Sequence, residues 1–102
     1  MIKQNNDFPV ILESYFTKHL SFERNFSENT YNTYLIVIKQ YLKYLSGIKN
    51  VKPKDISIYS FSKQNILDFL QYVEKELKCA VRTRNHKLTI INSFLEYAQS
   101  IN

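Results

Sequence analysis

Glycine and proline are scarce in this sequence. Its 102 residues contain one Gly and two Pro, where average usage gives about seven and about five. Because Gly supplies most of the positive-φ positions in tight turns, this scarcity disfavours a β-sandwich or a β-barrel. It equally disfavours a glycine-rich loop that cradles the phosphates of a nucleotide. Disorder is excluded by composition, since 44% of the residues are hydrophobic and only 23% are charged.

Cysteine and long apolar runs are also lacking. The single Cys79 cannot form an internal disulfide, and no Cys/His cluster has the spacing of a zinc site. The longest apolar run, Tyr34 to Ile38, is far too short to cross a bilayer, and the first seven residues lack the apolar core of a signal peptide. We therefore expect one soluble, cytoplasmic domain over residues 1–102, with flexible ends at 1–7 and 100–102 and with no metal or other cofactor.

Four segments have the apolar spacing of amphipathic helices, which predicts an all-α fold, a compact four-helix bundle. The expected helices span residues 9–21, 28–46, 63–78 and 81–99. Ser27 and Ser62 are expected to be N-caps, because each hydroxyl can accept a hydrogen bond from a backbone N–H one turn later. Phe26 and Tyr31 flank Ser27 at the positions of a hydrophobic staple. Gly47 is expected to end the second helix in a left-handed conformation.

The expected core follows the same spacing. It comprises Val10, Ile11, Leu12, Tyr15, Phe16, Leu20, Tyr31, Tyr34, Leu35, Ile38, Leu42, Leu45, Ile66, Phe69, Leu70, Val73, Leu77, Leu88, Ile91, Phe94, Leu95 and Ala98. Residues 34–38 alone could form a buried strand, but the cap, the length and the terminal glycine favour a helix. Ile36, Val37 and Tyr44 lie off the main apolar stripe, which indicates a central helix packed by several neighbours.

Positive charge gathers at the start of the fourth helix. The net charge is +5, and Lys78, Arg82, Arg84 and Lys87 fall within ten residues that contain no acid, with His86 among them. Backbone N–H groups at a helix start already attract phosphate. The helical wheel places one polar set opposite the apolar stripe, namely Arg82, Asn85, His86, Thr89 and Ser93, while Arg84 and Lys87 flank the stripe. Such a helix start suits DNA, although a solvated basic face is the simpler alternative.

Two further features bear on function. Residues 28–33, at the start of the second helix, carry small polar groups that can bond phosphates or bases, or that serve as ordinary first-turn caps. His19 and His86 are isolated, with no Ser, Cys or carboxylate at a spacing that indicates a catalytic pair. We therefore expect a binding module rather than an enzyme.

Three segments carry a resemblance to a known family. The segments are Ser27 to Tyr34 followed by Tyr41 to Leu45, then Phe61 to Val73, and finally Val81 to Ala98. In order and spacing, they resemble the core-binding domain of tyrosine recombinases. The resemblance implies the N-terminal, four-helix, SAM-like domain of a phage-type or Xer-like integrase. Ala80 departs from the family, which often has Ser before the last helix.

The resemblance also implies how the domain would work. This domain and a larger catalytic domain would form a clamp around double-stranded DNA, with the starts of the second and fourth helices facing the major groove of a recombination half-site. The implied contact residues are Asn29, Thr30, Asn32, Thr33, Arg82, Thr83, Arg84, Asn85, His86 and Lys87. The catalytic Arg, Lys and His residues and the tyrosine nucleophile would belong to the second domain, which we expect to be absent from this chain. Further partners would be that C-terminal domain and neighbouring recombinase protomers on DNA.

Two other functions remain open from the residues alone. The third and fourth segments could be the helix-turn-helix of a stand-alone DNA-binding regulator. Alternatively, Ile36, Val37 and Tyr44 could form an exposed patch of a helical protein-interaction module. The protein-interaction alternative requires these three side chains to be exposed, and it loses its main support if they are buried.

Overall fold

The computed structural model describes residues 8–101, and every regular element in this range is helical. The elements in chain order are α1 (Phe8–Ser14), η1 (Tyr15–Glu23), α2 (Glu28–Gly47), η2 (Pro53–Asp55), η3 (Ile58–Phe61), α3 (Lys63–Lys75) and α4 (Val81–Ser100). The all-α prediction is confirmed, and the four expected helices correspond to α1 with η1, α2, α3 and α4. The expected flexible end at residues 1–7 lies outside the described residues, as does residue 102.

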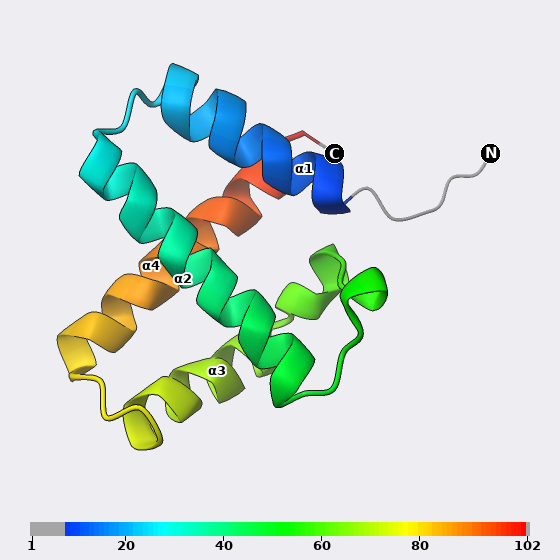
Figure 1. The fold of residues 1–102 in the computed structure, drawn as a ribbon, viewed down its shortest axis with the longest axis vertical. Helices are drawn as coiled ribbons and strands as arrows, with labels where there is room; N and C mark the ends of the chain where they lie inside the picture. The colour runs from blue at the N-terminus through cyan, green and yellow to red at the C-terminus, as the bar shows by residue number, and fades with distance from the viewer. Residues whose placement is uncertain (1–7, 102) are drawn as a thin grey trace.

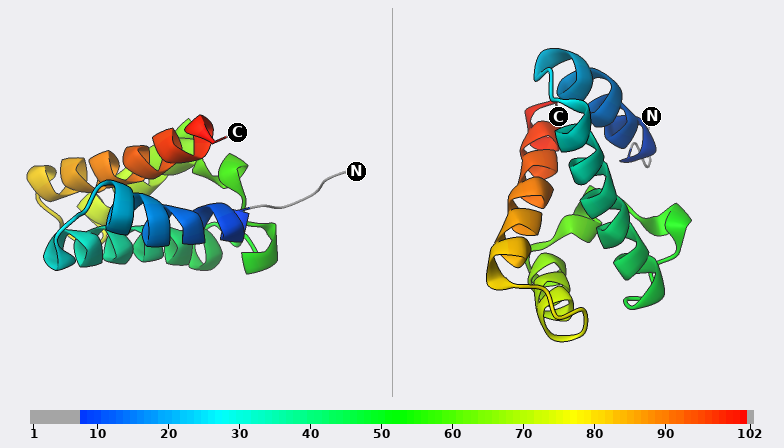
Figure 2. Two further views of the ribbon diagram at one scale, coloured as in Figure 1. Left: turned by 90° about the horizontal axis from the view of Figure 1, so that it is seen from above. Right: turned by 60° about the vertical axis from the view of Figure 1, so that its left-hand side comes forward.

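The helices form two layers in a flattened molecule with extents of 43, 33 and 18 Å. One layer holds α1, η1 and α2, and the other holds α3 and α4 (Figure 2). In Figure 1, α2 crosses over α4, and α4 contacts α2, α3, η1 and η3. The last helix is therefore the element on which the others pack.

The first helix differs from the prediction in its second half. Residues 15–23 form a π-helix, in which the backbone N–H of Arg24 donates to the carbonyl of His19, five residues earlier. The wider turn makes positions five apart neighbours, so that Tyr15 and Leu20 both face the core and are fully buried. Val10, expected in the core, is 67% exposed, because α1 buries the face of Phe8 and Ile11.

Aromatic rings from several elements meet at Phe94 of α4, which is fully buried. Its ring lies 5.9 Å from that of Phe8, 5.3 Å from that of Tyr15 and 5.1 Å from that of Phe61, measured between centroids. Tilted and edge-to-face pairs at these separations each add about 0.5–1.5 kcal/mol beyond the area that they bury. These contacts hold α1, η1 and η3 against α4.

Both serine caps are confirmed. The Ser27 hydroxyl accepts from the backbone N–H of Thr30 at 3.2 Å, and that of Ser62 accepts from Asn65 at 3.1 Å. At the entry to α2, the ring of Phe26 packs edge-on against Tyr34.

The prediction for Gly47 is wrong. Gly47 is the last helical residue of α2, and its φ is not positive. The chain turns three residues later, where Asn50 has a φ of 61° and the N–H of Val51 donates to the carbonyl of Leu45. Asn tolerates the left-handed region through local hydrogen bonding of its short side chain.

The last two helices also differ at their ends. α3 ends at Lys75 rather than at residue 78, and Leu77, expected in the core, is 44% exposed. The chain reverses at Lys78, where φ is 59°. In contrast, α4 continues to Ser100, which was expected in a flexible end.

The connector between α2 and α3 is more ordered than expected. Its 3-10 turns η2 and η3 bury Ile56 and Phe61 in the core. Lys49 Nζ donates to Asp68 of α3 at 2.6 Å, and Gln64 donates to the other carboxylate oxygen at 2.8 Å. These two hydrogen bonds lower the pKa of Asp68, and the bond with Asp68 raises the pKa of Lys49.

The aromatic cluster gives a first prediction. Phe94→Ala lowers the free energy of unfolding by about 3–5 kcal/mol, because it leaves a cavity among three rings. Phe22 is 84% exposed, so Phe22→Ala changes that free energy by no more than about 0.5 kcal/mol. Urea denaturation followed by far-ultraviolet circular dichroism measures both values. Equal effects of the two substitutions would contradict the assignment of Phe94 as the centre of the core.

The Lys49–Asp68 pair gives a second prediction. Because the folded-state pKa of Asp68 is lowered, its contribution to stability is complete above the ordinary aspartate pKa and is lost as pH falls through the folded value. Asp68→Asn is therefore less stable than wild type at neutral pH, and the difference diminishes as pH falls below the ordinary aspartate pKa. Chemical denaturation from neutral to acidic pH tests this, with the exposed Asp55→Asn as the charge-matched control. A wild-type advantage that persists in acid would contradict the prediction.

Candidate nucleic-acid interface

The starts of α2 and α4 lie along the same edge of the molecule. In Figure 1 both helices begin at the left edge and run to the right past their crossing point, and Figure 2 shows the same arrangement from above. The two segments that the sequence singled out, residues 28–33 and 82–87, are therefore brought to one edge by the crossing of α2 and α4.

The start of α2 presents small polar side chains to solvent. Asn29, Thr30, Asn32 and Thr33 are all exposed. The hydroxyl of Thr33 donates to the carbonyl of Asn29 at 3.0 Å, and that of Thr30 accepts from Ser27 at 3.0 Å. The two threonine hydroxyls thus form hydrogen bonds within the first turns of α2. The side chains of Asn29 and Asn32 are exposed to solvent.

The start of α4 carries the basic cluster. Arg82, Thr83, Asn85 and His86 are exposed. Ala80, which stands where the family often has Ser, occupies the N-cap without a side-chain hydrogen bond to the helix. The first backbone N–H groups of α4 therefore lack a side-chain cap and are available to an anion.

Arg84 and Lys87 differ from the other predicted contact residues because both are partly buried and paired within the protein. Arg84 donates from Nη1 to Glu74 and from Nη2 to Asn85, each at 3.0 Å, and its Nε is buried without a hydrogen-bond partner. Lys87 Nζ donates to Gln40 Oε1 of α2 at 2.6 Å. The Arg84–Glu74 pair is about one-third exposed, and such ion pairs contribute only about 0–1 kcal/mol, so a phosphate can compete for Arg84.

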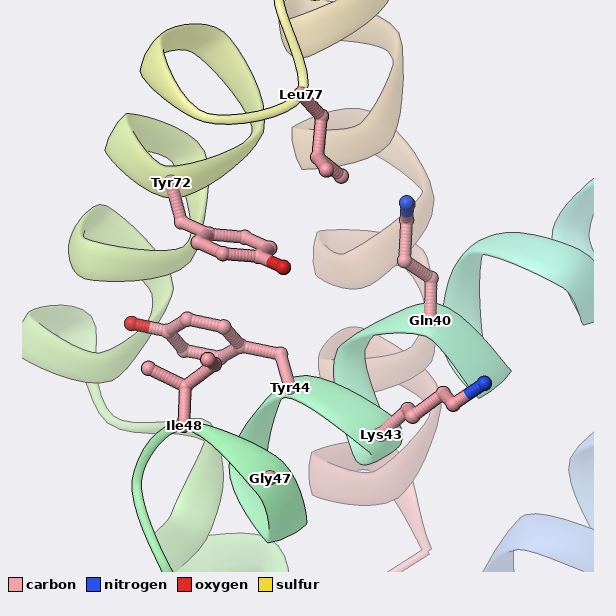
Figure 3. A pocket seen from close by; sticks show the side chains of 7 residues that line it. All are labelled: Gln40, Lys43, Tyr44, Gly47, Ile48, Tyr72 and Leu77. Carbon is pink, nitrogen blue, oxygen red and sulfur yellow. The ribbon is translucent and has the colours of Figure 1, made fainter.

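Gln40, the partner of Lys87, is a residue of this region that the sequence reasoning missed. With Lys43 it also lines a hollow of about 370 Å³ between the second half of α2 and the end of α3, together with Tyr44, Gly47, Ile48, Tyr72 and Leu77. Figure 3 shows the rings of Tyr44 and Tyr72 next to each other on one side of this hollow, with centroids 5.0 Å apart, and the Lys43 ammonium directed away from them. Gln40 follows Thr33 by seven residues, the spacing of one helix face, and this signal could have identified it.

Ser93 was placed on the polar face of the last helix, and this prediction is wrong. Its hydroxyl shares a hydrogen bond of 2.7 Å with the Tyr15 hydroxyl, which attaches η1 to α4. Burial raises the pKa of Tyr15 to about 12, although the bond to Ser93 acts in the opposite direction. Ser93 therefore belongs to the packing between helices, whereas Arg82, His86 and Thr89 remain exposed.

His19 lies in an aromatic cluster. Its ring lies 5.7 Å from that of Tyr15 and 4.7 Å from that of Tyr97, measured between centroids. Within residues 8–101, no group of three or more His, Cys, Asp or Glu side chains could hold a metal ion. None of the helices in the same range is both long and apolar enough to cross a membrane.

Comparison with known proteins identifies the family. Residues 12–101 match the family model of the phage integrase N-terminal SAM-like domain. The chain belongs to this family. The resemblance read from the sequence is thereby confirmed, and the helical fold is that of a SAM-like integrase domain.

Two bacterial proteins are similar to this SAM-like domain, both from Sinorhizobium fredii (strain NBRC 101917 / NGR234). One, named "Putative integrase/recombinase y4rC", is 32% identical over 88 residues, which cover 86% of this chain and 26% of the relative. The other, named "Putative integrase/recombinase y4rD", is 28% identical over 87 residues, which cover 85% of this chain and 31% of the relative. The domain thus spans about a quarter to a third of the length of these relatives. No solved structure gives a significant match.

Proposed function

We propose that this domain binds double-stranded DNA through the edge formed by the starts of α2 and α4. The observation that carries the proposal is that two helix starts, far apart in the sequence, bring exposed polar and basic side chains to one edge. Membership of the integrase family supports DNA as the partner. A DNA partner also agrees with the cytoplasmic location expected from the sequence.

The residues of this edge divide by chemistry. Arg82 and the uncapped N–H groups of α4 suit phosphate oxygens, which fix the position of a protein on the duplex. Asn29, Asn32 and Asn85 carry amides that can pair with the two hydrogen-bonding groups of adenine in the major groove. Thr30, Thr33, Thr83, Arg84, His86 and Lys87 complete the proposed contact set.

In a complete recombinase, we infer that the domain grips a recombination half-site and positions a C-terminal catalytic domain. The curated relatives are three to four times longer than the matched region, which leaves room for such a domain beyond the part that is similar. The present chain is then a non-catalytic module, and the strand-breaking chemistry and contacts with neighbouring protomers belong to the assembled recombinase.

The protein-interaction alternative loses its main support. It required an exposed patch of Ile36, Val37 and Tyr44, but Val37 and Tyr44 are only 4% and 6% exposed. The family match favours a recombinase module over a stand-alone regulator.

The proposed edge gives a third prediction. Arg82→Ala weakens binding to fluorescent duplex DNA and reduces the slope of log affinity against log salt by about 1, because one phosphate contact is lost. Lys54→Ala removes the same charge from η2, at the opposite edge of the molecule, and leaves the slope unchanged. Fluorescence anisotropy at several salt concentrations measures both. If wild type fails to bind any duplex even at low salt, DNA binding is refuted.

The Arg84–Glu74 pair gives a fourth prediction. Glu74→Gln removes the ion pair that holds Arg84 at 3.0 Å and frees the guanidinium for a phosphate. We expect DNA affinity at low salt to rise by up to about fivefold, the equivalent of about 1 kcal/mol. Glu96→Gln, an equal charge change in the second half of α4, serves as the control. Equal affinities of the two variants would show that Arg84 takes no part in binding.

A further inference from the structure

One apolar side chain stands exposed among the polar residues of α2. Ile36 is 63% exposed, whereas its neighbour Val37 is 4% exposed. The other large hydrophobic residues that are exposed lie outside α2. Because Val37 and Tyr44 are buried, Ile36 is not part of a larger apolar patch on α2.

The position of Ile36 on the helix connects it with the proposed DNA contacts. It follows Asn32 by four residues and Thr33 by three, and residues at these spacings are neighbours on one face of a helix. It also follows Asn29 by seven residues, two turns along the same face. All three polar residues are exposed. Ile36 therefore extends the same outward face of α2 beyond Asn29, Asn32 and Thr33.

Base edges in the major groove offer one apolar group, the C5-methyl of thymine. Hydrogen-bonding side chains read the donors and acceptors of the other bases, whereas an apolar side chain recognises this methyl by contact. A helix that lies in the major groove brings residues of its N-terminal turns to the base edges. An exposed isoleucine on such a face matches this group in polarity and shape.

We propose that Ile36 contacts the C5-methyl group of a thymine in the bound DNA and so determines part of the sequence preference of the domain. This inference rests on the proposed function, because it needs α2 to enter the major groove. It assigns a chemical preference to one position of the site, thymine over uracil and over cytosine. Asn29 and Asn32 would read the base pairs beside that thymine.

The test compares thymine with uracil, which lacks only the C5-methyl. A random-sequence duplex pool is enriched by repeated binding to the 102-residue chain. The enriched duplex is then synthesised in two forms, one with thymidine and one in which deoxyuridine replaces thymidine. We expect wild type to bind the deoxyuridine duplex about fourfold more weakly, the ratio for burying one methyl group (about 0.8 kcal/mol). Ile36→Ala binds both duplexes equally.

Val10→Ala is the matched control, because Val10 is also β-branched and 67% exposed but lies in α1. This variant keeps the fourfold ratio. The ratio reports the methyl contact itself, since a general loss of affinity or stability weakens binding to both duplexes alike. Circular dichroism verifies that both variants keep their helices.

Two results would overturn the inference, and they differ in what they leave standing. If Ile36→Ala keeps the same thymine-to-uracil ratio as wild type, the contact is refuted while DNA binding by the domain stands. If wild type binds no duplex of the pool at any salt concentration, both the proposed function and the contact are refuted.

Discussion

The packing of aromatic rings around Phe94 is the interaction on which the rest of the structure depends. Rings from α1, η1 and η3 all contact this one side chain of α4. They fix α4 against the first helix and the connector, and α2 then crosses α4 at one place. Because a close-packed interior tolerates little displacement, the starts of α2 and α4 are held in a fixed relation at the edge of the molecule. A rigid edge of this kind suits recognition of a duplex, whose groove spacing is also fixed.

Polar contacts between helices refine that arrangement. Lys87 of α4 bonds to Gln40 of α2 at 2.6 Å, and Tyr15 of η1 bonds to Ser93 at 2.7 Å. A net hydrogen bond contributes only about 0.5–1.5 kcal/mol, so these bonds specify orientation more than they add stability. The Arg84–Glu74 ion pair, which is about one-third exposed, contributes only about 0–1 kcal/mol. The edge thus combines permanently exposed groups, such as Arg82, with a cation that must exchange partners before it can bind a phosphate.

Much of the fold could be predicted from the sequence, because the decisive signals are local. Ser27 and Ser62 cap α2 and α3 as expected, since a hydroxyl one turn before a backbone N–H needs no distant partner. The errors have non-local causes. Val10 is exposed because the first helix is oriented so that Phe8 is buried instead. The π-helical turns bury both Tyr15 and Leu20, and they are set by packing against α4, where Tyr15 contacts Phe94. Gly47 remains helical because the chain turns at Asn50 instead.

The sequence by itself determined the helical class, the caps, the family resemblance and the presence of a basic cluster before Leu88. These follow from residue spacing and from side chains that act within one turn of their own backbone. Only the tertiary structure decided which polar side chains face solvent. Arg82 is exposed, whereas Arg84 is held by Glu74, Lys87 by Gln40 and Ser93 by Tyr15. The physical reason is that each of these partners lies on another helix, and which helices meet depends on burial of the whole core.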